Sequence, residues 1–487
     1  MTSERRRANR RVAVAVVAVA IAAAPLMARQ ALDRTKIPPP GKPPVLRVPV
    51  WTRSTLTNGA ELILSEKHDL PLVSFSITIL GGADQFEKPD RRGVAALTAS
   101  MLSEGTKTRD GESLSNALQL LGTDVSTAIG SESGSMSFVA TSGKVTSTLD
   151  ILADMLVNST FPADALERVR AQQLVALTQA KAEPSSIAAR VFPHVLYGAA
   201  HPYGQLVTEA SIKAITREDV IAFHREYFRP GRALVTVVGD IKPAEIKSVI
   251  ERALGGWTGA GEKPTFSYPP PPAPSSRTIF LVDKPGSAQS TFAIGNVGPP
   301  RNTPDYFALV VMNTILGDQF QSRLNANLRE EKGYSYGVTS RFAFGKGPGP
   351  FRTGGDIVSD KTDAALVEFM KELRGIAGGR PVTDDELTTA KDALVQGLPS
   401  TFASVSGING AITSLWRQGL PDDYYHQYAK AVRAITKDDV VRVARKYIDL
   451  DHLAIVIVGD RATTEGRLKA TGIAPIVLLD IEGNRAE

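Results

Sequence analysis

ITREDVIAFHREYFRPGRALVTVVGD, residues 215–240, has a similar counterpart later in the chain, and this repeat indicates the fold. Residues 435–460 read ITKDDVVRVARKYIDLDHLAIVIVGD, at an offset of 220 residues and without a gap. In each copy a threonine suited to cap a helix, Thr216 or Thr436, precedes acidic residues of a first helical turn. A tyrosine, an apolar strand and Gly-Asp then follow in the same register, which identifies an internal duplication of domain size.

Between the two copies lies a segment in which neither a helix nor a strand is expected. It contains Gly255-Gly256, Gly259 and the proline run 269–272, a composition typical of a linker. We therefore predict related α+β domains at residues 48–260 and 276–470. Residues 261–275 are the predicted linker, and residues 471–487 are expected to form a tail.

Composition excludes several classes of protein. A chain of 487 residues is too long for one ordinary core, and it has no cysteine. Disulfides and thiolate catalysis are therefore excluded, and any metal would need His, Asp or Glu ligands. Residues 1–28 carry +4 of the formal net charge of +5, so the remainder carries about +1 and gives no sign of nucleic-acid binding.

The first residues have the layout of a secretory signal peptide. Residues 1–28 combine a basic start, an apolar run at residues 12–24 and small residues near Ala28, which predicts export. The apolar run is short for a membrane span, and a membrane anchor that stays uncleaved is the alternative. Residues 29–47, which include a proline cluster, are expected to form an extended tether.

The best candidate for chemistry lies in the second half, where residues 328–338 read LREEKGYSYGV. Arg329 falls in the last turn of a predicted helix, Gly333 is placed as its left-handed cap, and Tyr336 opens a predicted strand. A tight turn of this kind can aim both side chains at one space, where they can bind a peptide carbonyl and stabilise an oxyanion. An exposed arginine and a packed tyrosine at a helix end are the alternative from spacing alone.

Together with Ser322-Arg323-Leu324, this stretch resembles the second-half signature of the pitrilysin/insulinase family of zinc peptidases. More narrowly, it resembles the branch that includes mitochondrial processing peptidase and bacterial two-chain peptidases. It covers essentially the whole mature chain and implies two homologous domains, each a mostly antiparallel mixed sheet backed by helices. It also implies that Arg329 holds the substrate backbone and that Tyr336 helps to stabilise the tetrahedral intermediate.

The zinc ligands that the resemblance implies are absent from the sequence. The family carries His-x-x-Glu-His on a helix of the first domain, and the matching residues 93–102 read GVAALTASML. Ala96 and Ser100 stand at the two histidine positions and Ala99 at the glutamate position. Residues 174–180, where the family places a distant glutamate, contain none, and the six histidines form no close pair on one helix. We therefore expect no metal and no other cofactor in this chain.

The resemblance also implies where a peptide substrate would bind. In the family, the region that matches residues 121–137 lines a chamber, and its strand can pair with an extended peptide through main-chain hydrogen bonds. The candidates for this substrate-binding strand are Thr127, Ala128, Ile129 and Gly130. A plain hairpin without a binding role is the alternative interpretation.

The two domains have kept different parts of the family's machinery, and this asymmetry suggests a function. The metal ligands are lost, whereas Arg329 and Tyr336 stand in their motif, as in the non-zinc chain of the two-chain peptidases. We therefore predict the non-zinc subunit of an exported, periplasmic heterodimeric metallopeptidase, inactive alone. Its homologous partner would carry zinc, and unfolded peptides would be the substrates. The alternative is a non-catalytic peptide-binding or assembly protein of the same fold.

Overall fold

The computed structural model describes residues 41, 45–272 and 274–486. The predicted signal peptide and most of the predicted tether therefore lie outside the described residues. Within them, no helix combines the length and the hydrophobicity that crossing a membrane requires.

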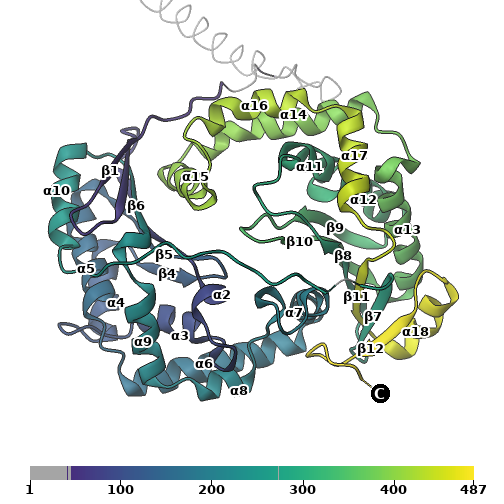
Figure 1. The fold of residues 1–487 in the computed structure, drawn as a ribbon, viewed down its shortest axis with the longest axis horizontal. Helices are drawn as coiled ribbons and strands as arrows, with labels where there is room; N and C mark the ends of the chain where they lie inside the picture. Colours follow the sequence, from purple (N-terminus) through teal and green to yellow (C-terminus); the bar gives the residue numbers. More distant parts are fainter. Residues whose placement is uncertain (1–40, 42–44, 273, 487) are drawn as a thin grey trace, which may run out of the picture. The chain divides into compact units, whose positions relative to one another are not determined.

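The N-terminal half, residues 45–257, is built on a mixed sheet of six strands. The strands are β1 (Thr52–Thr55), β2 (Glu61–Glu66), β3 (Leu72–Leu80), β4 (Ser126–Ile129), β5 (Ser133–Thr141) and β6 (Ala233–Gly239). Their order across the sheet is β1-β2-β6-β3-β5-β4 (Figure 1). Only β2 and β6 pair in parallel, and all other neighbours are antiparallel.

The C-terminal half, residues 278–486, repeats this plan. Its strands are β7 (Thr278–Asp283), β8 (Gln289–Val297), β9 (Ser335–Phe342), β10 (Pro350–Val358), β11 (Ala454–Gly459) and β12 (Ile476–Leu479). The order β12-β7-β11-β8-β10-β9 matches that of the first sheet, with the parallel pair β7–β11 in the place of β2–β6. The prediction of two related α+β domains, each a mostly antiparallel mixed sheet with helices, is confirmed.

Helices cover both sheets (Figure 1). Those of the N-terminal half are α2 (Ala83–Phe86), α3 (Val94–Met101), α4 (Gly111–Leu121), α5 (Val145–Asn158), α6 (Ala163–Ala182), α7 (Pro184–Tyr197), α8 (Glu209–Ala214), α9 (Arg217–Tyr227) and α10 (Pro243–Ala253). Those of the C-terminal half are α11 (Tyr306–Asn313), α12 (Arg323–Asn325), α13 (Thr362–Arg374), α14 (Asp384–Thr401), α15 (Val405–Gln418), α16 (Tyr424–Ala434), α17 (Lys437–Tyr447) and α18 (Arg461–Ala470). The π-helical turn η6 (Ala326–Glu331) continues α12.

The duplicated stretch forms the same structure twice. Thr216 and Thr436 cap α9 and α17, each accepting a hydrogen bond of 3.1 Å from the backbone N–H three residues later. α9 packs against α3, and α17 packs against α11. The caps, helices and strands therefore keep the register that the sequence repeat predicted.

Each half covers one face of its sheet with a helix that comes from the other half. α7 of the N-terminal half packs on β8 and β11, and α15 of the C-terminal half packs on β3 and β6. α7 contributes apolar side chains such as Val191 and Phe192, whereas α15 adds the buried amide of Asn409 to apolar neighbours such as Ile408 and Ile412. This exchange makes the cores of the two halves depend on one another.

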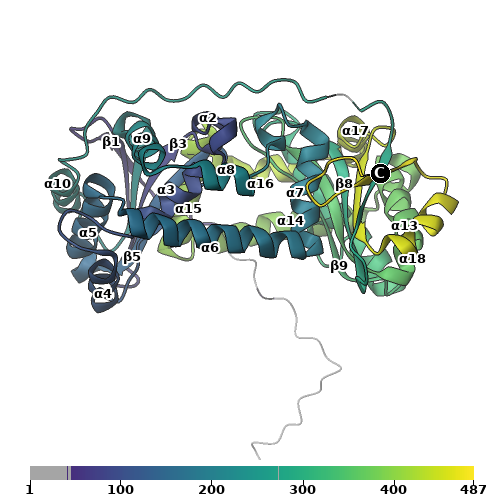
Figure 2. The ribbon, with the colours of Figure 1, turned by 90° about the horizontal axis from the view of Figure 1, so that it is seen from below.

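The segment between the halves contains no strand or helix in its described residues, 258–272 and 274–277. Figure 2 shows it as an extended segment that runs from one half to the other. The end of the chain differs from the expected tail, because β12 is an edge strand of the second sheet and pairs in parallel with β7. Four apolar residues are too few to reveal a period in the sequence, so only the pairing with β7 shows that β12 is a strand.

Candidate functional site

Arg329 closes a helix whose end is fixed by backbone hydrogen bonds. The Gly333 N–H donates to the Arg329 carbonyl at 3.1 Å, and the Tyr334 N–H donates to the Leu328 carbonyl at 2.8 Å. Gly333 has φ +64°, in the left-handed region that favours glycine. The chain turns there into β9, the edge strand of the second sheet, whose second residue is Tyr336. The helix, cap and strand therefore follow the predicted order.

The Arg329 and Tyr336 side chains lie together, and Phe320 joins them. The Arg329 Cζ atom is 5.2 Å from the centroid of the Tyr336 ring and 4.1 Å from that of the Phe320 ring. Tyr336 is 88% exposed, so it is not the packed tyrosine of the alternative interpretation. Sequence reasoning missed Phe320, because a lone aromatic residue in a connecting segment carries no periodic signal.

Most of the guanidinium of Arg329 has no acceptor among the residues that the structure describes. Its Nε lies 3.2 Å from the Glu330 carboxylate, and no described residue accepts a hydrogen bond from Nη1 or Nη2 within the distances that define one. The Tyr336 hydroxyl is open to solvent on its exposed side chain. Two groups of hydrogen-bond donors thus stand free beside one another at a sheet edge.

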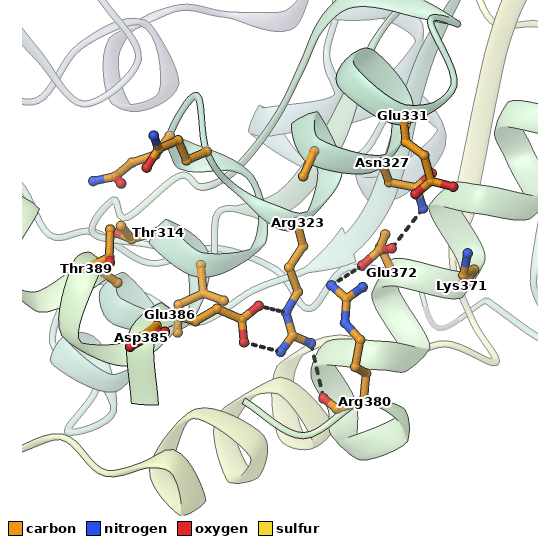
Figure 3. A pocket seen from close by; sticks show the side chains of 15 residues that line it. Thr314, Arg323, Asn327, Glu331, Lys371, Glu372, Arg380, Asp385, Glu386 and Thr389 are labelled. Carbon is orange, nitrogen blue, oxygen red and sulfur yellow. Dashed lines mark hydrogen bonds and ion pairs between the residues drawn. The ribbon is translucent and has the colours of Figure 1, made fainter. Parts of the chain in front are cut away.

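Ion pairs anchor the other side of this helix. Arg323, which is 3% exposed, donates to both oxygens of Glu386, at 2.6 and 2.8 Å. Partial burial opposes ionisation of Glu386, but the Arg323 hydrogen bonds outweigh it and hold the pKa of Glu386 at about 2. A cavity of about 400 Å³ lies here, and the Arg380–Glu372 pair, at 2.9 Å, and Asn327 also line it (Figure 3).

The helix that would carry a zinc motif presents no metal ligands. Ala96 and Ser100 are exposed one turn apart on α3, while Ala99 is buried. α3 packs against β4 and α6, and the latter contains residues 174–180 without a glutamate. Throughout the described ranges, no three His, Cys, Asp or Glu side chains are grouped to hold a metal ion. Methyl groups and one hydroxyl do not fit the ligand chemistry of zinc.

The predicted substrate-binding strand is the edge strand β4 of the first sheet, which pairs only with β5. The Gly130 N–H donates to the Ser133 carbonyl at 2.9 Å, and the Gly130 carbonyl accepts from Ala83 at 2.9 Å. Gly130 therefore has both main-chain polar groups engaged. Because hydrogen-bonded pairs alternate in an antiparallel ladder, the N–H and C=O of Thr127 and Ile129 face the free edge, and those of Ala128 face β5.

Two sequence models of one protein family match the chain. The family described as Insulinase (Peptidase family M16) matches residues 62–202, and the Peptidase M16 inactive domain matches residues 214–394. The uncharacterized zinc protease YmxG of Bacillus subtilis is 24% identical, over 73% of this chain and 86% of its own length. A probable mitochondrial-processing peptidase subunit beta of Arabidopsis thaliana is also 24% identical, over 85% of this chain and 79% of its own length.

Solved structures share the fold. A peptidase M16 inactive domain from Pseudomonas fluorescens is 26% identical with a TM-score of 0.77, covering 84% of this chain and 98% of that one. The periplasmic protease PqqL from Escherichia coli is 17% identical with a TM-score of 0.71, covering 86% of this chain and 46% of that one. Because the M16 models match both halves and the structures match across them, the chain belongs to the insulinase family, peptidase family M16.

Proposed function

We propose that this chain is the non-zinc subunit of a heterodimeric metallopeptidase. The observation that carries the proposal is the contact between the half-buried Arg329 and the exposed Tyr336, in a chain whose α3 offers no metal ligand. A homologous partner would supply the zinc, the attacking water and the general base. This chain would supply the groups that bind the peptide and its developing negative charge.

The two side chains suit different parts of that task. The planar guanidinium of Arg329 can donate two hydrogen bonds to peptide carbonyls through Nη1 and Nη2. The Tyr336 hydroxyl can donate one hydrogen bond to an oxygen that becomes negative in the transition state. In the N-terminal half, the free edge of β4 can hold an extended, unfolded peptide through the main chain of Thr127 and Ile129.

The proposed location is outside the cytoplasm, most simply the periplasm. It rests on the signal-like residues 1–28, and an uncleaved segment would instead anchor the protein to the membrane. The name of the structural neighbour PqqL, a periplasmic protease, is in keeping with this location.

A second function follows if the free donors serve binding alone. The loss of ligands at Ala96, Ala99 and Ser100 also suits a peptide-binding or assembly protein that takes no part in catalysis. In that case the chain would bind an unstructured peptide without accelerating its cleavage by any partner.

The test is hydrolysis of an unstructured quenched peptide by the purified mature chain, alone and mixed with a homologous chain that carries an intact His-x-x-Glu-His motif. We expect no zinc and no activity alone, and strong activity on mixing. Tyr336→Phe should then lower kcat by about 10²–10³, the usual cost of one oxyanion donor, with heterodimer formation unchanged by size-exclusion chromatography.

Tyr334→Phe is the matched control. Tyr334 lies two residues before Tyr336, but it is partly buried and packs against the hydrophobic core of the C-terminal half. The substitution should leave kcat unchanged. Normal turnover of either Tyr336→Phe or Arg329→Ala would contradict the catalytic proposal. Peptide binding without any acceleration on mixing would establish the second function instead.

A further inference from the structure

Phe320 is the only exposed phenylalanine in the described part of the chain, with 59% of its surface accessible. Burying such a ring removes apolar surface from water and stabilises a protein, so its exposure calls for another explanation. The Phe320 ring contacts Arg329, whose Cζ atom lies 4.1 Å from the ring centroid. This distance is well within the range of a cation–π contact.

A contact of this kind leaves the hydrogen-bonding capacity of the arginine intact. An aromatic ring attracts a guanidinium through its face, whereas the N–H donors of Arg329 lie at the edge of the guanidinium plane. Phe320 and Tyr336 therefore restrict the orientation of the group without consuming its donors. A free arginine side chain loses rotamer entropy when it is immobilised, and these contacts remove part of that loss before a peptide binds.

The backbone on either side of Phe320 is held in place by a buried amide. Asn325, 7% exposed, donates to the Gln319 carbonyl at 3.1 Å, and its Oδ1 accepts from the Val338 N–H at 3.0 Å. The Ser322 N–H also donates to the Gln319 carbonyl, at 3.1 Å. Asn325 thus ties the residue before Phe320 to β9, two residues beyond Tyr336. These hydrogen bonds hold the backbone beside Phe320 close to β9, the strand that carries Tyr336.

We propose that Phe320 is a positioning residue, which orients the Arg329 guanidinium toward the peptide backbone. The inference rests on the proposed function of Arg329 and extends it to a residue that the family motif does not include. It also assigns Asn325 the task of keeping the Phe320 segment and β9 in register. Removal of the aromatic face should weaken catalysis only while Arg329 is present.

The test uses the heterodimer with its zinc-bearing partner and compares Phe320→Leu with Phe320→Trp. Leucine keeps an apolar side chain but has no aromatic face, so kcat/KM should fall three- to tenfold. Tryptophan keeps the face and should retain at least half of the activity. Because Phe320 is exposed, both variants should unfold at the temperature of the unmodified protein. The control is Leu120→Ala, which truncates a side chain on α4 that is 86% exposed. It should change neither kcat/KM nor the unfolding temperature.

A double-mutant cycle with Arg329→Ala separates the two proposals. If Phe320 acts through Arg329, Phe320→Leu should have no further effect once Arg329 is alanine. If Phe320→Leu lowers kcat/KM equally with and without Arg329→Ala, the positioning role is overturned. Full activity of Phe320→Leu, where Arg329→Ala impairs the complex, would overturn it as well. Full activity of Arg329→Ala itself would overturn the proposed function, and the positioning role with it.

Discussion

The two halves of the chain have the same strand order and the same helix pair at one side of the sheet, yet their edges differ. In the N-terminal half, the edge strand of the sheet is β4, which has four residues and packs against α3, where Ala96 and Ser100 are exposed. In the C-terminal half, the corresponding edge strand is β9, which has eight residues and carries the exposed Tyr336 beside Arg329. The duplicated core has thus stayed constant while the chemistry at the two edges has diverged, as expected when function depends on sites and not on the fold.

The helices that the halves exchange differ in a similar way. Phe192 on α7 is 1% exposed and fills an apolar layer over the second sheet. Asn409 on α15 is 5% exposed and donates to the carbonyls of Ser74 and Thr236, at 3.3 and 3.2 Å. It also accepts a hydrogen bond of 2.7 Å from Ser76. The contact of α7 with the second sheet therefore depends on shape and apolar area, whereas the contact of α15 with the first sheet adds a buried polar network.

The largest expected effect is a loss of stability when either exchanged helix is altered. Phe192→Ala should lower the free energy of unfolding by about 3–5 kcal/mol, the usual cost of emptying a buried aromatic site. Asn409→Ala should cost about 1–3 kcal/mol, because it removes these buried hydrogen bonds and leaves the buried Ser76 hydroxyl without its acceptor. Urea unfolding followed by circular dichroism measures both. A larger loss from Asn409→Ala than from Phe192→Ala would reverse the comparison.

The second effect concerns one aspartate in each half, whose pKa values move in opposite directions. Burial raises the pKa of Asp84 from 3.8 to about 6, and the ion pair with Arg92, at 3.5 Å, opposes this rise without cancelling it. Asp305 is also partly buried, but hydrogen bonds from Lys446, Arg442 and Tyr447 lower its pKa to about 2. The folded state therefore loses stability at Asp84 as the pH rises from 3.8 to 6. It loses stability at Asp305 as the pH falls from 3.8 toward 2.

Asp84→Asn should accordingly raise the free energy of unfolding above pH 6, by up to about 2–3 kcal/mol from the size of the pKa shift. This gain should vanish below pH 3.8. Asp305→Asn should lower stability at pH 7, and the loss should shrink below pH 3.8. Denaturant unfolding between pH 3 and pH 8 provides the two curves, and parallel pH dependences for the two variants would show that the carboxylates do not differ.

The smallest effect tests whether the free edge of β4 binds peptide. The N–H of Thr127 faces outward from the sheet, so Thr127→Pro should remove one hydrogen bond to a peptide, while the pairing with β5 remains. A loss of roughly 0.5–1.5 kcal/mol corresponds to a KM about two- to tenfold higher. Thr127→Ala keeps the N–H and should leave KM unchanged. Equal KM values for both variants and the unmodified complex would favour a plain hairpin.

The sequence was sufficient for every feature that local rules govern. The duplication at residues 215–240 and 435–460 predicted two related domains, because cap residues and apolar periods keep their register. Gly333 and its spacing to Arg329 and Tyr336 predicted the helix end and the strand that follows. These features depend on neighbouring residues and on backbone sterics, which a linear sequence states directly.

Long-range packing decided the rest. The exchange of α7 and α15, the pairing of β12 with β7, and the contact of Phe320 with Arg329 join residues whose proximity no local period reveals. The same holds for the ionisation of Asp84 and Asp305. Both are aspartates, but their pKa values shift in opposite directions, because burial and hydrogen-bond partners set a pKa. The duplication and the missing metal ligands could thus be inferred from residue identities alone. Which side chains meet could not, because those contacts depend on how segments that are distant in the sequence pack against one another.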